Sequence, residues 1–393
     1  MSQRGFSLAV AIAAIILVPA HTAVAQSTWS TASGGNWHDA ANWLGGVPDA
    51  ADATAAFGPT QPVSGSTVLL DGSATLGVME IGGPASITFD VAPTDPDSES
   101  IFDAGAAQAE LLSVSSSSSP RYDFNTAMRL DSDLLVEHQG GAATEAVFTF
   151  NGAISGDGEL TLRSGVILAG DNGAFTGDVT IDAGEGVVEV LKEPSLGCGA
   201  IDLRSGILFA HTDNRHCNAN VTINGGELWM PNITRINGHV TQVTGRFSPG
   251  YTGSTGTAAG LTAIVGEYEQ GSDSIFHAEL AGFGYLLFDR LHVYGPASLE
   301  GALDVTLVDG FIPDPTDVYA ILIATSITGQ FTNATDRIFV GGGWFDVVYS
   351  STQVTLANFA PIPEPATLLL LVPAGVLLAG YRAPIPACRA GPG

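Results

Sequence analysis

Apolar and polar residues alternate over short segments in the middle of the chain. In "DVTIDAGEGVVEV" (178–190), the apolar residues Val179 and Ile181 alternate with the polar residues Thr180 and Asp182. Successive side chains of a β-strand point to opposite faces, so this pattern predicts a strand with one buried face and one solvent-facing side. The chain is therefore expected to form short strands.

The alternating segments recur at a regular spacing. "LTLRSGVILAG" (160–170) recurs 41 residues later as "IDLRSGILFAH" (201–211), and 178–190 is followed 42 residues later by "NVTINGGELWM" (220–230). One segment thus begins about every 20 residues, the length of one coil of a parallel β-helix, in which each strand buries its inner face by stacking on the next coil. Glycines such as Gly184 and Gly206 are expected at the corners. We predict an all-β, right-handed parallel β-helix (β-solenoid) with capping strands.

Residues 152–197, "GAISGDGELTLRSGVILAGDNGAFTGDVTIDAGEGVVEVLKEPSLG", resemble the passenger-associated β-strand repeat of autotransporter-like surface proteins. The family pattern is Gly-x-Leu-x-Leu, a Gly-Asn-x-Phe/Tyr-x-Gly turn and Thr-x-Ile/Val-x-x-Gly. The chain matches it with Gly158 to Leu162, "DNGAFTG" (171–177) and Thr180 to Gly184, and departs from it where "EGVVEV" replaces the usual Gly-Thr-Leu. The resemblance implies a β-solenoid fold and a surface location, and it carries no catalytic residue.

The segments on either side of the repeats predict the two ends of the fold. Trp29, Trp37 and Trp43 favour a cap over the first coil, because large aromatic side chains usually serve burial; a platform for sugars is the alternative. "WFDVVYSSTQVTLANF" (344–359) predicts a closing hairpin. We divide the chain into a signal peptide (1–25), an N-terminal cap with the first coils (26–90), irregular coils and loops (91–150), β-solenoid repeats (151–245), a C-terminal β region (246–360) and a sorting signal (361–393).

The first residues predict export. Arg4 precedes an apolar run that ends at Val18, and Ala23-Val24-Ala25 has the small-x-small pattern of a signal-peptidase site. Cleavage after Ala25 leaves a mature chain that begins at Gln26. We expect the general secretion machinery to carry this chain across the inner membrane.

A second apolar run lies near the C-terminus. Residues 366–381 would extend about 24 Å as a helix, against a hydrocarbon core of about 30 Å, so the run is a marginal transmembrane span. Together with Pro363-Glu364-Pro365 before it and Arg382 after it, the run resembles the PEP-CTERM sorting signal of Gram-negative bacteria. The family usually has a tight arginine cluster here, whereas this tail spreads Arg382 and Arg389 apart.

The resemblance implies a transmembrane sorting helix that a membrane-embedded exosortase recognises. The exosortase would cleave near the motif and release or attach the protein outside the cell. We therefore expect transient or partial anchoring in the inner membrane and a final location at the cell surface or outside the cell.

The charge of the chain excludes several partners. Asp and Glu number 40 against 13 Lys and Arg, which gives a formal net charge of −27. Such a chain is repelled by nucleic acids and by anionic membrane surfaces. The hydrophobic content of 45% argues against disorder, and the 49 glycines suit turn-rich β-structure.

Candidate chemistry is sparse. Cys198 and Cys217 are 19 residues apart, close to one coil, so they could occupy equivalent corners about 4.8 Å apart and form a disulfide; two free buried thiols are the alternative. "HTDNRHC" (211–217) matches no standard zinc spacing, and we expect no metal and no cofactor. Asp182 and Asp202 could stack as paired acids on adjacent coils, yet nothing in the sequence sets them apart.

The sequence contains no HExxH, Gly-x-Ser-x-Gly or phosphate-loop motif. We expect no catalytic residue and a structural or adhesive protein of the cell surface or extracellular matrix. The alternative is a polysaccharide-binding or polysaccharide-degrading β-helix protein. The expected partners are the exosortase, the secretion machinery and, as a further candidate, extracellular polysaccharide.

Overall fold

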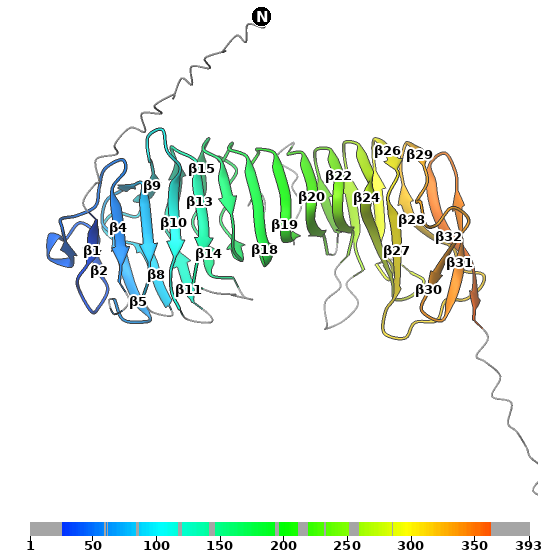
Figure 1. The fold of residues 1–393 in the computed structure, drawn as a ribbon, viewed down its shortest axis with the longest axis horizontal. Helices are drawn as coiled ribbons and strands as arrows, with labels where there is room; N and C mark the ends of the chain where they lie inside the picture. The colour runs from blue at the N-terminus through cyan, green and yellow to red at the C-terminus, as the bar shows by residue number, and fades with distance from the viewer. Residues whose placement is uncertain are drawn as a thin grey trace, which may run out of the picture.

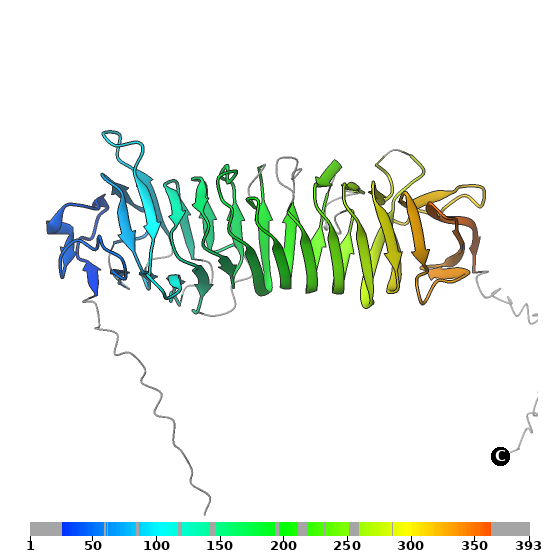
Figure 2. The ribbon, with the colours of Figure 1, turned by 90° about the horizontal axis from the view of Figure 1, so that it is seen from above.

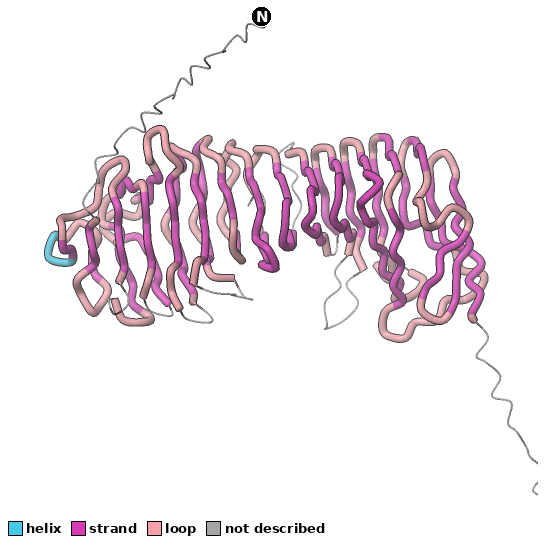
Figure 3. Tube along the Cα trace, in the orientation of Figure 1, coloured by secondary structure: helices cyan, strands magenta, loops and turns pink. Residues whose placement is uncertain are grey.

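The computed structural model describes residues 26–362, except for 59, 61, 84–85, 117–119, 141–145, 193–195, 211–218, 232, 251–258 and 285. The described residues form 32 strands in three sheets, with one short 3-10 helix at Ala40–Asn42 and no α-helix. They build one elongated stack from β1 (Ser27–Trp29) to β32 (Gln353–Pro361) (Figures 1 and 3). The predicted all-β class is confirmed.

Parallel pairing between successive coils organises the largest sheet, and its strands follow one another along the stack (Figure 2). Val179 lies beside Ile201, and Ile201 lies beside Val221. This arrangement is compatible with the β-solenoid that the sequence predicts. The repeat region contributes β16 (Leu160–Leu162), β17 (Val166–Leu168), β18 (Val179–Val190), β19 (Ile201–Ala210), β20 (Val221–Trp229), β22 (Val240–Ser248) and β24 (Tyr268–Leu280).

The same sheet extends to both sides of the repeats. On the C-terminal side, β24 pairs in parallel with β26 (Pro296–Leu299) and β27 (Ala302–Leu307), and β26 pairs with β29 (Ser326–Gly329). On the N-terminal side the sheet contains β1, β2 (Gly35–Asn36), β3 (Trp43–Leu44), β4 (Thr54–Phe57), β5 (Ser66–Leu70), β7 (Val78–Ile81), β8 (Ser86–Val91), β10 (Ala109–Ser113), β11 (Arg121–Phe124), β13 (Leu134–His138) and β14 (Phe148–Phe150).

Two smaller sheets form the remaining side of the coils. The first is wholly parallel and contains β6 (Ala74–Leu76), β9 (Glu99–Phe102), β12 (Ala127–Leu130) and β15 (Ile154–Gly156). The second begins with parallel pairs and ends with antiparallel ones. It contains β21 (Ile233–Ile236), β23 (Leu261–Ile264), β25 (Arg290–Val293), β28 (Tyr319–Ile323), β32, β31 (Gly343–Tyr349) and β30 (Arg337–Val340).

The long strands of the repeat region bend in the middle at a glycine. In β18 the pairing with β19 shifts register between Asp182 and Val187, and Gly184 lies there with a φ of +64°. Gly206 in β19 has a φ of +82°. Side chains with a Cβ rarely adopt such angles, which explains why glycine stands at these predicted corners. Each long strand thus supplies two sides of a coil.

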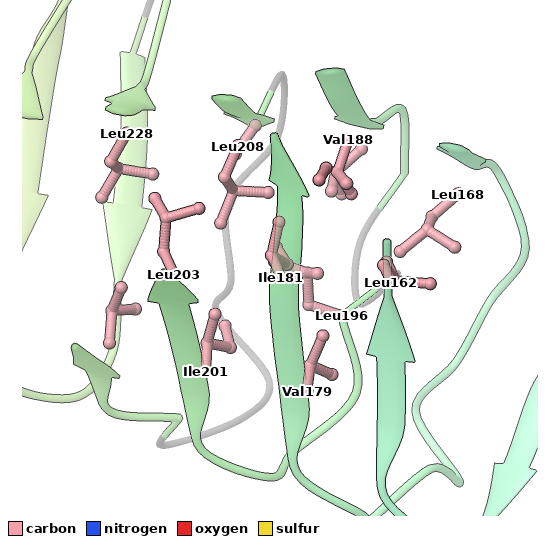
Figure 4. Close-up of a cluster of buried hydrophobic side chains, with 14 of the residues drawn as sticks. Leu162, Leu168, Val179, Ile181, Val188, Leu196, Ile201, Leu203, Leu208 and Leu228 are labelled. Atoms are coloured by element: carbon pink, nitrogen blue, oxygen red, sulfur yellow. The ribbon is translucent and has the colours of Figure 1, made fainter. Parts of the chain in front are cut away.

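Buried apolar side chains form a continuous core along the stack. Leu162, Ile181, Leu203 and Ile223 are fully buried, and each lies beside the next across the parallel pairings. Figure 4 shows the first three of these together with Val188 and Leu208 from the second halves of their strands. Fully burying such a side chain contributes roughly 1.5–3 kcal/mol, and a coil can do so only against its neighbours.

Polar side chains at the corners connect one coil to the next. The carboxylate of Asp133 accepts a hydrogen bond from the backbone N–H of Glu159 (2.8 Å), and Asp178 accepts one from Ala200 (2.8 Å). These bonds satisfy N–H groups that precede the strands, and they help to fix the register between coils.

At the N-terminal end, three tryptophans fill the first coil. Trp29, Trp37 and Trp43 are at most 5% exposed, and the rings of Trp37 and Trp43 lie 4.8 Å apart. The indole nitrogen of Trp37 donates to the Pro48 carbonyl (3.1 Å), and that of Trp43 donates to the Trp37 carbonyl (2.6 Å). These side chains form the core of the end rather than a solvent-facing platform for sugars.

Antiparallel strands close the C-terminal end. The predicted hairpin is present as β31 and β32, and β30 pairs with β31 at the edge. Phe331 is fully buried and stacks on Phe276 with ring centroids 5.9 Å apart. Asn333 covers the free edge of β27, since its side chain accepts from the Leu303 N–H (2.9 Å) and donates to the Leu303 carbonyl (2.8 Å).

None of the described residues belongs to a helix long and apolar enough to cross a membrane. The sorting-motif residues Pro363, Glu364, Pro365 and Arg382 lie outside the described residues, and so do Ala23 and Ala25. Gln26, the expected first residue of the mature chain, is the first residue described. The signal peptide and the sorting helix therefore stay predictions.

Candidate functional site

The structure describes one of the two cysteines that the sequence predicts to pair. Cys198 lies before β19 and is disulfide-bonded, and its sulfur is 3.7 Å from the Gly173 carbonyl oxygen. Cys217 and Cys388 lie outside the described residues. The pairing of Cys198 with Cys217 remains a prediction.

The acids Asp182 and Asp202 do not stack on each other. Asp202 lies between Thr180 and Thr222 of the adjacent coils, whereas Asp182 lies beside Ser205, whose hydroxyl donates to it at 2.7 Å. The pairing of β18 with β19 places Thr180, not Asp182, opposite Asp202, so Asp182 lies two residues further along its strand.

Asp202 instead belongs to a shallow polar groove of about 320 Å³ on the outward face of β18, β19 and β20. Arg204 Nε donates to one Asp202 oxygen (2.7 Å), and Asn224 Nδ2 donates to the other (2.7 Å). The hydrogen bond and charge of Asp202 raise the pKa of Arg204 above its usual range. The hydroxyl of Thr180 donates to Glu159 (2.7 Å) at the other end of the groove. The groove thus presents both donors and acceptors to a polar ligand.

Two aromatic side chains lie on the second halves of β19 and β20, beyond the glycine bend. The rings of Phe209 and Trp229 are 6.2 Å apart in an edge-to-face arrangement, and both are half-buried. The Trp229 indole nitrogen donates to Glu227 (2.9 Å). An aromatic side chain beside a carboxylate is the combination that sugar-binding surfaces use.

A second polar cluster is buried on the outward face of β22, β24 and β27. His277 is 1% exposed, and its ring nitrogens lie 3.1 Å from the hydroxyl oxygens of Ser248 and Thr306. Burial and the nearby charge of Arg246 lower the pKa of His277 to about 4. The neutral imidazole therefore links the three strands through two hydrogen bonds.

This cluster contains a hydroxyl, an imidazole and a carboxylate, but its geometry differs from that of a catalytic triad. Ser248 is fully buried, and the Asp304 carboxylate lies 2.5 Å from Arg246 and 3.9 Å from the imidazole of His277. A nucleophile must reach its substrate, and a base needs a partner that orients it. The cluster is arranged to hold strands together.

Two buried acids extend the cluster. Burial raises the pKa of Glu279 to about 7, against the opposing charge of Arg246. Burial also raises the pKa of Asp289 to about 8, although its carboxylate accepts hydrogen bonds from the N–H groups of Gly260 (2.8 Å) and Glu279 (3.0 Å). The sequence analysis missed these residues because outward positions of a coil are expected to face water. Here the segment that carries Asp289 pairs with the end of β24, because the Asp289 N–H donates to the Glu279 carbonyl (2.9 Å).

No group of three or more His, Cys, Asp or Glu side chains within the described parts of the chain could hold a metal ion. The segment 211–217 lies outside the described residues.

Neither a scan against protein-family models nor a search of curated proteins finds a match for this chain. The resemblances to the β-strand repeat and to the PEP-CTERM signal therefore rest on the quoted residues alone.

Proposed function

We propose that this chain is an exported structural or adhesive protein of the cell surface or extracellular matrix. The observation that carries the proposal is the uninterrupted parallel stacking of coils from β4 to β29, in which the described corner side chains bind the next coil. A stack of this kind produces length and a large repetitive surface. We assign a right-handed turn to the coils, because crossover connections between parallel strands are right-handed in nearly all proteins.

We further propose that the chain is delivered by a PEP-CTERM signal through an exosortase. The support is the sequence of the tail, in which Pro363-Glu364-Pro365 precedes an apolar run that is marginal as a membrane span. A weak span holds the protein in the membrane long enough for cleavage. Release then leaves the folded stack outside the cell.

The intact mass of the protein from membrane and medium fractions tests the delivery. The medium form is expected to lack the residues after the motif, and Glu364→Ala should prevent their loss. A form that retains Gly393 in both fractions would overturn the sorting proposal.

Deletion of the gene tests the structural role, because a cell-surface rod should contribute to biofilm or floc cohesion. Unchanged cohesion would argue against this role.

The polar groove, together with Phe209 and Trp229 further along the same strands, favours a second candidate function, the binding or cleavage of polysaccharide. Screening on glycan arrays and in lyase assays tests this candidate. Asp202→Asn and Trp229→Ala should each abolish binding or turnover, whereas Asp123→Asn, a change on a distant coil, should not. If neither the arrays nor the assays give a signal, the structural role stands as the single candidate function.

A further inference from the structure

Apolar side chains are exposed on the outward face of the last antiparallel strands. Phe339 on β30 is 70% exposed and Ile362, directly after β32, is 53% exposed. Trp344 on β31 is half-buried between them. Isolated apolar residues are common on protein surfaces, so the question is whether these three form one patch.

The strand register places them on one face. Phe339 lies directly opposite Trp344, and Trp344 lies directly opposite Ala360. Ile362 follows Ala360 by two residues and continues the pairing, since its N–H donates to the Gly342 carbonyl (2.8 Å). Residues two apart on a strand share a face. The rings of Phe339 and Trp344 are 6.3 Å apart, and Ile362 lies on the same face.

The patch has the chemistry of a membrane interface. Tryptophan is enriched where bilayers meet water, because its ring is apolar and its N–H can bind water or headgroups. The Arg337 guanidinium lies over the Trp344 ring at 5.1 Å and pairs with Asp346 at 3.4 Å, so the rim is polar without a net charge. A net charge of −27 on the whole chain disfavours anionic lipid.

The patch also lies where the chain leaves the fold. The apolar run of the tail begins at Ala366, four residues after Ile362. Four extended residues span at most about 14 Å. If the run is in a bilayer, this end of the stack must lie at the surface of that bilayer. This step rests on the membrane role of the tail that forms part of the proposed function.

We propose that Phe339, Trp344 and Ile362 form a docking face that seats the C-terminal end of the stack on the zwitterionic headgroup region of the membrane that holds the tail. While the tail is in the membrane, the docking face fixes the end of the stack against the lipid surface. After cleavage the face is exposed to water.

Tryptophan quenching by brominated lipid tests the docking face. The full mature chain, 26–393, is reconstituted into phosphatidylcholine vesicles that carry bromine near the headgroups, and vesicle flotation confirms that the tail has inserted. Three of the five tryptophans are buried at the far end, so Trp344→Phe identifies the contribution of the docking face. Emission from Trp344 is expected to fall by at least about twofold, since interfacial tryptophans lie at the depth of the bromine atoms.

The double variant Phe339→Ser/Ile362→Ser should float with the vesicles and lose most of this quenching. Leu44→Ser, an equally exposed apolar residue at the opposite end, is the matched control and should leave quenching unchanged. Flotation without quenching of Trp344 overturns the docking face and leaves the tail proposal intact. A chain that does not float overturns both. A dimer in detergent that Phe339→Ser dissociates would assign the face to a second copy and overturn membrane docking.

Discussion

The two ends of the stack close in opposite ways. At the N-terminal end, Trp29, Trp37 and Trp43 point inward and leave at most 5% of their surface exposed. At the C-terminal end, Phe331 fills the interior, while Phe339 and Trp344 lie on the outside of an antiparallel hairpin. Any parallel stack must cover its last coil, because an open edge recruits other strands. Among the described residues, the C-terminal end places Phe339 and Ile362 on one exposed outward face, which is the basis of the docking proposal.

The largest expected effect comes from removing a tryptophan at the N-terminal end. Trp37→Ala deletes a fully buried ring and its hydrogen bond to the Pro48 carbonyl. Substitutions of this size cost about 3–5 kcal/mol, so the first coils should unfold at lower urea concentration and become open to proteases. Urea unfolding and limited proteolysis measure the change. A cost below about 0.5 kcal/mol, the range expected for a surface change such as Leu44→Ala, would show that the tryptophans do not stabilise the N-terminal end.

The pH dependence of stability sharpens the contrast, because the described acids with raised pKa values lie toward the C-terminal end. Folding keeps Glu279 protonated up to a pKa of about 7, whereas the unfolded group ionises near 4.5. Its contribution to stability is therefore complete below 4.5 and is lost as the pH rises to about 7. His277 acts in the opposite sense, because its folded pKa is about 4 and its stabilisation is lost as the pH falls from 6.5 to 4.

Glu279→Gln removes the ionisable carboxyl group. The loss of stability between pH 4.5 and 7 should therefore become smaller by up to about 3 kcal/mol, at about 1.4 kcal/mol for each pKa unit. Thermal unfolding at several pH values measures it. Glu185→Gln, at an exposed corner, is the control and should follow the wild-type profile. Identical profiles for Glu279→Gln and wild type would show that burial does not shift this carboxyl.

A smaller effect is expected at the edge strand that Asn333 covers. Asn333→Ala removes both hydrogen bonds to Leu303 and leaves a backbone donor and acceptor on β27 open. The loss should cost about 1–3 kcal/mol and promote end-to-end association. Light scattering and urea unfolding measure the two effects. Asn151→Ala, which removes a side-chain hydrogen bond to Asn125 between coils, should leave association unchanged.

The sequence predicted the repeat region well because its coils are nearly equal in length. Ile201 pairs with Val221, 20 residues later, and the alternation around both residues shows the buried face. Outside the repeats the spacing varies: Leu134 pairs with Leu160, and Val240 pairs with Tyr268. A fixed period could not show that stacking continues through these coils. Their loops differ in length, so their inner faces align only in three dimensions.

The candidate sites were harder to predict than the fold. Asp202 lies opposite Thr180 rather than Asp182, and His277 is held between Ser248 and Thr306 of the two neighbouring strands. Both are contacts between neighbouring coils or loops. Alternation along a single strand contains no information about them.

The smallest expected effect tests whether Phe339, an exposed aromatic residue of the C-terminal end, stabilises the hairpin that closes this end. Phe339 is 70% exposed, so Phe339→Ser should change the free energy of unfolding in water by no more than about 0.5 kcal/mol. Urea unfolding of the chain without vesicles measures this change. A cost above about 1.5 kcal/mol would mean that Phe339 supports the hairpin as Trp37 supports the first coil, and the contrast between the two ends would disappear. A near-zero cost would show that the exposed Phe339 does not stabilise the fold. This is the result expected if Phe339, beside Trp344, contacts a surface outside the chain.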